Sequence, residues 1–361
     1  MSERRAQETT EPSMRTSKAS EYYTAEGSPF GRRIFNVRNL ASIFLTLVVL
    51  YLVYQELLDL DWREAWAGVR EVNAGLFALA FVIFYCSFVV RARRWETLLV
   101  NVGYDRAAVH RMLSPLDFIK ILYLACFVNC LTVARLGDSY RGYLLKKAVG
   151  ASFMVTLGTV LAERLLDMFV LAMMMGAGVL IAFHRSLPAE AIQALGAGLA
   201  LTVVGVLVLL SMRRFREAVE RVLPKRLHAH YARLEHGIVG SFRRLPLLVA
   251  YSVFGWLIEG ATLYITAAAV GAPVSVAGAL VVALTAALLT TVPITPAGLG
   301  FTETGMVVML QGLGLDTYTA SAITLLFRII NYWSIVVFGF ALYVSIYNRN
   351  QLTEERLGCH G

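Results

Sequence analysis

Charged side chains inside an apolar run are the first feature of this sequence that suggests chemistry. Glu163, Arg164 and Asp167 interrupt the apolar run of about 152–183. Inserting one such group into a bilayer costs roughly 2.5–3.5 kcal/mol, so ionisable groups there usually have a function. On a helix Glu163 and Asp167 share a face and Arg164 reaches Asp167, so one of the two negative charges has no positive partner. We expect that charge to attract a cation, a proton or another helix's arginine. The alternative is an ion-pair network that only fixes helix packing.

Two arginines follow the apolar run of about 115–134. Arg135 and Arg141 enclose Gly137 and Asp138. The planar guanidinium group suits bidentate recognition of phosphate. We predict that the two arginines bind a headgroup phosphate and that Asp138 orients one of them. The alternative is a basic loop on the cytoplasmic side.

A cluster of helix-breaking residues interrupts a third apolar stretch. The break contains Pro293, Pro296, Gly298 and Gly300. Proline cannot donate a backbone hydrogen bond, and glycine adopts backbone angles that other residues avoid. A half-helix is expected to begin near Phe301, with its amide groups facing the break as an anion site. Glu303 in its first turn would repel an anion, so we expect it to bind an arginine or take up a proton.

The last apolar run, about 317–346, contains a single arginine. Arg328 is followed by Asn331, Tyr332 and Trp333. An arginine within a membrane needs a carboxylate or a phosphate. We predict that Arg328 binds a headgroup phosphate or an acid such as Glu163 or Glu303, and that Tyr332 and Trp333 line the cavity. Glu259 is a further isolated acid in the run of about 246–271.

The composition places these groups in a membrane protein. Of the 361 residues 57% are hydrophobic and 16% charged, against about 25% charged in typical soluble domains, and the mean hydropathy is +0.62. The 4 cysteines show no metal-ligand spacing, so no metal and no cofactor are expected. The net charge of +8 is explained by the excess of lysine and arginine in cytoplasmic loops, so nucleic acid is not an expected partner.

The apolar runs and the positive charges together predict the topology. We expect an all-α integral membrane protein with about six full transmembrane helices and two broken or re-entrant helical elements. We expect residues 1–38 to form a disordered cytoplasmic tail, 39–346 the transmembrane domain and 347–361 a short cytoplasmic tail. Within the domain, 212–245 is a basic cytoplasmic linker. The apolar runs are about 39–58, 74–90, 115–134, 152–183, 189–211, 246–271, 277–292, 301–313 and 317–346.

The re-entrant elements follow from the positive-inside rule. If 115–134 crossed the membrane fully, the basic stretch 135–150 would lie outside. A hairpin that dips in from the cytoplasm avoids this. The pair 277–292 and 301–313 would dip in from the other side, because 271–276 and 311–319 contain no basic residue. Both termini then lie on the cytoplasmic side of the inner membrane.

The ordered set of motifs resembles the lysylphosphatidylglycerol synthase transmembrane family, also described as flippase-like domain or UPF0104-type membrane proteins. The resemblance covers about residues 40–345 and departs from the family pattern at Asp138, usually Glu, and at Ala297, usually Gly. The matching segments are Arg135-Leu136-Gly137-Asp138 with Arg141, Glu163-Arg164-Leu165-Leu166-Asp167, Thr295-Pro296-Ala297-Gly298-Leu299-Gly300 with Glu303, and Arg328 with Tyr332-Trp333.

The resemblance implies the membrane half of a bifunctional protein. The family's best-known members carry an aminoacyl-transferase domain after the membrane part and move the aminoacylated lipid between leaflets. Only about 15 residues follow the last apolar run here, so the resemblance implies translocation alone. A separate synthase or a second copy of the chain are the protein partners it suggests.

Three functions remain in competition. The first is a translocator of a phospholipid or a lipid-linked anionic substrate, which also contacts anionic inner-leaflet lipids. Such transport is passive, exchange-driven or proton-coupled through Glu163, Asp167 or Glu303, because the sequence has no phosphate-binding loop for nucleotide hydrolysis. The second is a membrane-embedded enzyme of lipid modification, although the usual hydrolase and metalloprotease motifs are missing. The third is a membrane scaffold subunit without transport activity.

Overall fold

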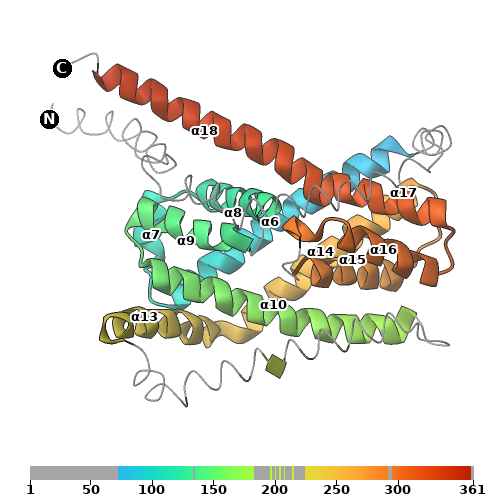
Figure 1. Ribbon diagram of the computed structural model, residues 1–361, viewed down its shortest axis with the longest axis horizontal. Helices are drawn as coiled ribbons and strands as arrows, with labels where there is room; N and C mark the ends of the chain where they lie inside the picture. Colours follow the sequence, from blue (N-terminus) through green and yellow to red (C-terminus); the bar gives the residue numbers. More distant parts are fainter. Residues whose placement is uncertain are drawn as a thin grey trace, which may run out of the picture.

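The computed structural model describes residues 72–132, 135–182, 224–291 and 295–358, with scattered residues between 196 and 214 (Figure 1). These residues form helices and their connections, without a strand. The expected tail 1–38, the first apolar run 39–58, most of the run 189–211 and Pro293 lie outside the described residues. The expectation of an all-α membrane protein is confirmed.

Helix α6, Ala74–Asn101, begins at Asn73, whose side chain accepts hydrogen bonds from the amides of Gly75 and Leu76. The helix is longer than its apolar run of about 74–90. Its last three turns still contribute to the core, since Trp95 and Leu98 are almost completely buried. The basic residues at the start of the stretch 91–114 therefore lie on a packed helix rather than in a loop.

The first expected broken element is a helical hairpin. The short helix α7, Arg106–Met112, is followed at a bend of 79° by α8, Pro115–Leu131. Helix α8 begins with a capping box between Ser114 and Asp117. The chain reverses at Arg135 and returns as α9, Leu136–Val149, which packs against α8.

A long helix runs beside this hairpin and packs against a shorter one. Helix α10, Phe153–Ala182, passes along the lower side of Figure 1, with α13, Lys225–Ser241, packed against one end. The two backbones meet at Gly158 and Gly237, where an added Cβ at Gly158 would lie 2.5 Å from the carbonyl oxygen of Leu234. Part of the expected basic linker 212–245 is therefore a helix that packs on the domain.

The second broken element is also a hairpin. Helix α14, Leu245–Ala269, packs along α6, and α15, Val276–Thr291, follows it. After the break, a short turn η3, Pro296–Gly298, leads into α16, Phe301–Gly312, which packs back on α15. Half-helices thus flank both breaks, as the sequence predicts.

The chain ends in a long rod that a π-helical turn interrupts. Helix α17, Thr317–Arg328, passes through the π-turn η4, Ile329–Trp333, into α18, Ser334–Gly358. In Figure 1, α18 (red) extends well beyond the other helices. The stretch 347–358, expected as a short tail, continues this helix.

Within the described residues, three helices are long and apolar enough to cross a membrane. They are Ala74–Asn101, Lys225–Ala269 and Thr317–Ile346, and the bent pair α7–α8 adds a fourth if it counts as one span. Helix α10 has 30 residues, about 45 Å at 1.5 Å per residue, but contains three charged residues. The expected number of six full spans is not established, because two of the apolar runs lie mostly outside the described part.

Candidate functional site

A cavity of about 180 Å³, lined by both charged and apolar side chains, lies where the two helix breaks approach each other. The tip of the first hairpin contributes Thr132 and Arg135, and the tip of the second contributes Thr295 and Ala297. The polar lining is Arg91, Asn129, Thr132, Arg135, Arg164, Asp167, Glu259, Thr290, Thr291, Thr295, Thr302, Arg328, Asn331 and Tyr332.

Unusual backbone geometry is concentrated at this cavity. Arg135, with φ 54°, and Ala297, with φ 49°, are the only non-glycine residues of the described chain with positive φ, and both line the cavity. The left-handed conformation costs about 1–2 kcal/mol for a residue with a Cβ. Such strain persists where the surrounding structure enforces it, often at functional sites. The π-turn η4 contributes Asn331 and Tyr332 to the same cavity.

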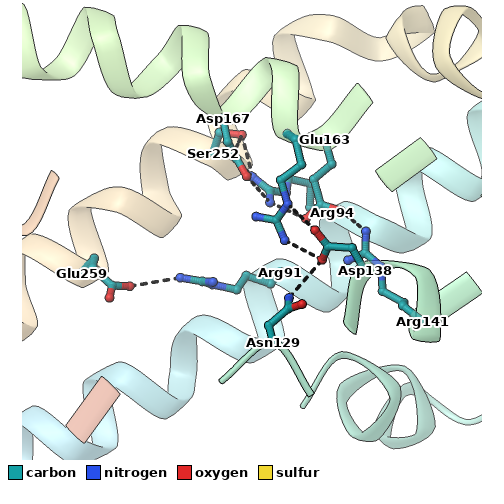
Figure 2. A network of polar contacts seen from close by, with 10 residues as sticks. Arg91, Arg94, Asn129, Asp138, Arg141, Glu163, Asp167, Ser252 and Glu259 are labelled. Atoms are coloured by element: carbon teal, nitrogen blue, oxygen red, sulfur yellow. Dashed lines mark hydrogen bonds and ion pairs between the residues drawn. The ribbon is translucent and has the colours of Figure 1, made fainter. Parts of the chain in front are cut away.

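A buried ion-pair network lies beside the cavity, centred on Arg94 of α6 (Figure 2). Arg94 donates to Glu163 at 2.5 Å and to both carboxylate oxygens of Asp167, at 2.5 and 3.0 Å. Ser252 of α14 accepts from Arg94 and donates to Asp167. Glu163 and Asp167 thus share one face of α10, and the partner from another helix is Arg94.

Arg141 supplies a second positive charge to the same carboxylate. It donates to the other oxygen of Glu163 at 2.5 Å, and its guanidinium lies 4.7 Å from the ring centre of Trp95. Arg141 is 2% exposed and does not line the cavity. The structure therefore places it in the helix-packing network, away from the position expected of a phosphate ligand.

Asp138 joins the two hairpin helices to α10. It accepts from Arg164 Nε at 3.1 Å and Nη2 at 2.9 Å, and from Asn129 Nδ2 at 3.3 Å. Asn129 also accepts from the amide of Gly137 at 2.8 Å. The sequence predicts that Arg164 reaches Asp167, but the structure pairs Arg164 with Asp138 of α9 because its side chain is directed toward the hairpin.

Arg328 anchors the second hairpin tip. Its Nε donates to Glu303 at 2.5 Å, and its guanidinium lies 4.8 Å from the ring centre of Tyr332. Glu303 also accepts from the amide of Gly300 at 2.7 Å, which caps α16. A carboxylate of the protein thus accepts a hydrogen bond at the start of this helix, the place that the sequence predicts as an anion site.

The charges around the cavity leave one cation over. Five carboxylates there have an arginine partner each, whereas Arg135 makes no hydrogen bond or ion pair with any described residue. The pairs are Arg91–Glu259, Arg94–Asp167, Arg94–Glu163, Arg141–Glu163, Arg164–Asp138 and Arg328–Glu303. Three buried polar atoms of lining residues also lack a partner in the described chain: Trp256 Nε1, Thr302 Oγ1 and Asn331 Oδ1.

The remaining predicted residues are distributed around this arrangement. Tyr332 lines the cavity, but Trp333, which was expected to line it too, is 46% exposed on the outside of the rod. Pro296, Gly298 and Gly300 form the second hairpin tip. At Gly298, φ is +67° and an added Cβ would lie 2.5 Å from Thr302 Oγ1, so the turn requires glycine there.

Sequence reasoning missed Arg91 and Arg94. Both fall in the stretch 91–114, which the count of positive charges assigned to a cytoplasmic segment. The signal that would have found them is the continued helical spacing of Ala92, Trp95 and Leu99, which extends the buried face of α6 past the apolar run.

Comparison with known proteins agrees with the motifs. A family model described as the lysylphosphatidylglycerol synthase TM region matches residues 39–339. A UPF0104 membrane protein of Methanocaldococcus jannaschii is 32% identical over 231 residues, which are 64% of this chain and 98% of the relative. UPF0104 membrane proteins of Methanothermobacter thermautotrophicus and Pyrococcus horikoshii are 26% and 22% identical, over 78% and 76% of this chain and 86% and 90% of theirs. The chain is therefore an integral membrane protein that belongs to the lysylphosphatidylglycerol synthase transmembrane family.

Proposed function

We propose that the protein moves the phosphate-bearing headgroup of an anionic lipid, or of a lipid-linked substrate, across the cytoplasmic membrane through the cavity between the two hairpins. The observation that carries the proposal is Arg135, a cation at a strained hairpin tip that lines the cavity and has no partner among the described residues. A charged group buried in a membrane protein is stable only when it is compensated. An anionic oxygen of a phosphodiester is the compensating group that suits a guanidinium.

The surroundings of Arg135 favour an anion over a cation. Arg91, Arg164 and Arg328 line the same cavity, against Asp167 and Glu259. Each of these three arginines has a carboxylate partner, so Arg135 is the one cation of the cavity lining without a partner among the described residues. An anionic oxygen of a ligand would give Arg135 the partner that the described residues do not provide. A headgroup without an anionic oxygen would leave Arg135 unpaired.

The two hairpins also suit a path for a polar group. Broken helices expose backbone groups only where protein or water covers them, and here both breaks face one cavity. The lipid tails would stay in the bilayer while the headgroup passes between the hairpin tips. Neither lipid modification nor a scaffold role has a specific observation in its favour.

The test is transport by the purified chain in liposomes that contain fluorescent phosphatidylglycerol. We expect Arg135→Ala to lower the transport rate and weaken binding of short-chain phosphatidylglycerol about ten- to a hundredfold, the loss of one charge-assisted hydrogen bond. The matched control is Arg111→Ala, because Arg111 is an exposed arginine of α7 outside the cavity. Arg111→Ala should behave as the wild type.

Other probes separate the possible sources of the phosphate. Glycerol 3-phosphate offers the same group without tails, and phosphatidylcholine offers a phosphodiester without net charge. Binding of phosphatidylglycerol alone supports a lipid substrate, and equal binding of glycerol 3-phosphate points to a soluble one. Wild-type transport by Arg135→Ala would contradict the proposal.

A further inference from the structure

Glu259 of α14 has fewer partners than the other four carboxylates around the cavity. It accepts one hydrogen bond from a described residue, from Arg91 Nη2 at 3.0 Å. Asp138, Glu163, Asp167 and Glu303 each accept at least two. Figure 2 shows Arg91 and Glu259 as a separate pair, apart from the network around Arg94.

Both members of this pair line the cavity. The side chain of Glu259 is 11% exposed and that of Arg91 is 32% exposed, so the arginine is the more accessible partner. The indole Nε1 of Trp256, one helical turn before Glu259, also lines the cavity and lacks a partner. The other charged groups that line the cavity around Glu259 are Arg164 and Asp167 of α10, Arg135 at the first hairpin tip and Arg328 of α17; α15, which packs against α14, contains no charged residue.

We infer that Glu259 is the proton site of the protein and that an anionic ligand drives proton uptake by taking Arg91 from it. The inference rests on the proposed function, since the ligand is the same phosphodiester that Arg135 binds. In the empty cavity Arg91 bonds to the Glu259 carboxylate. When the ligand enters, the guanidinium of Arg91 turns to a phosphate oxygen, and Glu259 takes a proton from the aqueous side.

The charges balance in this exchange. The ligand contributes one negative charge and the proton one positive charge, so the loaded cavity carries the same net charge as the empty one. A carboxylate left without its single arginine in a low-dielectric cavity is more stable protonated. The other acids are less suited to this role. Arg94, the partner of Glu163 and Asp167, does not line the cavity, and Asp138 and Glu303 have a donor besides their arginine, Asn129 and the Gly300 amide.

The exchange predicts how binding depends on pH. By linkage, if binding takes up a proton, then a proton promotes binding. The Kd for the ligand should therefore rise by up to about tenfold per pH unit where Glu259 is ionised in the empty protein, and level off at lower pH. Short-chain phosphatidylglycerol is a suitable probe because its phosphodiester keeps one negative charge over this range.

The experiment measures proton uptake when the purified full chain in weakly buffered detergent is mixed with short-chain phosphatidylglycerol. We expect the wild type to take up about one proton per bound ligand. Glu259→Gln keeps the acceptor for Arg91 but cannot titrate, so it should bind the probe with no proton uptake and with a Kd that does not change with pH. Glu259→Asp should restore both effects.

Asp316→Asn is the matched control, since Asp316 is an exposed acid that caps α17 away from the cavity. It should match the wild type. Ligand binding by the wild type without proton uptake, or an unchanged pH dependence in Glu259→Gln, overturns the exchange and leaves the proposed function standing. Failure of the wild type to bind any probe contradicts the proposed function and the exchange together.

Discussion

At the scale of single residues, the arginines around the cavity fall into two kinds. Arg94 has two carboxylate partners and a hydroxyl partner in a fully buried position, whereas Arg135 has none within the described chain. The first kind holds helices together, because removing it leaves uncompensated charges. The second kind costs stability and is retained for another reason, which fits a ligand site.

Removing Arg94 is therefore expected to destabilise the fold strongly. In Arg94→Met, Glu163 keeps Arg141, but Asp167 loses its only arginine in a buried position. Breaking a buried pair from one side costs about 3–5 kcal/mol. The measurement is the unfolding curve of the purified protein in detergent against denaturant concentration, and the variants are compared by the midpoint of this curve.

The neighbouring residue provides the control for this experiment. The side chain of Arg93 is 45% exposed and pairs with Glu96 at 3.0 Å. Arg93→Met should cost about 0–1 kcal/mol, because Arg93 is half-exposed and Glu96 keeps Arg106 and His110 as partners. Equal midpoints for the two variants would show that the Arg94 network does not stabilise the fold.

Most of the charged residues were readable in the sequence, Arg91 and Arg94 excepted, but their pairing was not. Helical spacing correctly placed Glu163 and Asp167 on one face. It also paired Arg164 with Asp167, whereas Arg164 bonds to Asp138 across two helices. Spacing along one helix shows which side chains can meet, and the tertiary packing decides which do.

At the scale of elements, each hairpin depends on close approach of two backbones. In the first hairpin, an added Cβ at Gly137 of α9 would lie 1.9 Å from the carbonyl oxygen of Ala125 and 2.7 Å from Asn129 Oδ1. Non-bonded heavy atoms do not lie this close together, so one of the two helices would have to shift. Gly137 is therefore the contact that sets the distance between α8 and α9, and with it the position of Arg135.

Gly137→Ala is expected to separate α8 from α9 and to displace the hairpin tip. The clash is with backbone, so side-chain rotation cannot relieve it, and a cost of about 1–3 kcal/mol is expected for such overpacking. Ligand binding should weaken as well, because Arg135 lies only two residues before Gly137. Thermal unfolding and the Kd for short-chain phosphatidylglycerol measure the two effects.

Gly255 of α14 is the matched control for Gly137. An added Cβ there meets no atom within 4 Å, and φ is in the normal helical range. Gly255→Ala should leave stability unchanged or raise it by up to about 1 kcal/mol through helix propensity. If Gly137→Ala is tolerated equally well, the hairpin is looser than its backbone contacts indicate.

The sequence predicted the positions of both breaks better than their shapes. Prolines and glycines marked the second break, and the distribution of positive charge indicated a reversal after 134. Nothing in the sequence indicated the left-handed conformations of Arg135 and Ala297, since a residue with a Cβ rarely adopts them. The π-turn at Ile329–Trp333 also had none, because the apolar run continues through it.

At the scale of the whole molecule, apolar packing surrounds the cavity and brings the two hairpin tips together. One buried cluster joins α10, α14, α15, α16 and α17, and another joins α6, α8, α9 and α10. A third, with Phe84, Tyr123 and Tyr332, connects α6 and α8 to the π-turn. The family model covers the chain from 39 to 339, so the site belongs to the shared transmembrane region. The sequence predicted that two broken elements enter from opposite faces, and this orientation can be tested directly.

Two introduced cysteines test that orientation in a variant that lacks the native Cys86, Cys126, Cys130 and Cys359. Met112→Cys lies at the bend before α8, where Met112 is 55% exposed, and Tyr318→Cys lies after the second hairpin, where Tyr318 is 61% exposed. The arginines of the segment 91–114 around α7 should hold Met112 on the cytoplasmic side, while no basic residue lies in 311–319. A membrane-impermeant maleimide should therefore label Tyr318→Cys in intact cells and Met112→Cys only after permeabilisation. Labelling of both positions from the same side would show that the two hairpins do not enter from opposite faces. It would then also contradict a path in which the headgroup passes from one hairpin to the other at the centre of the membrane.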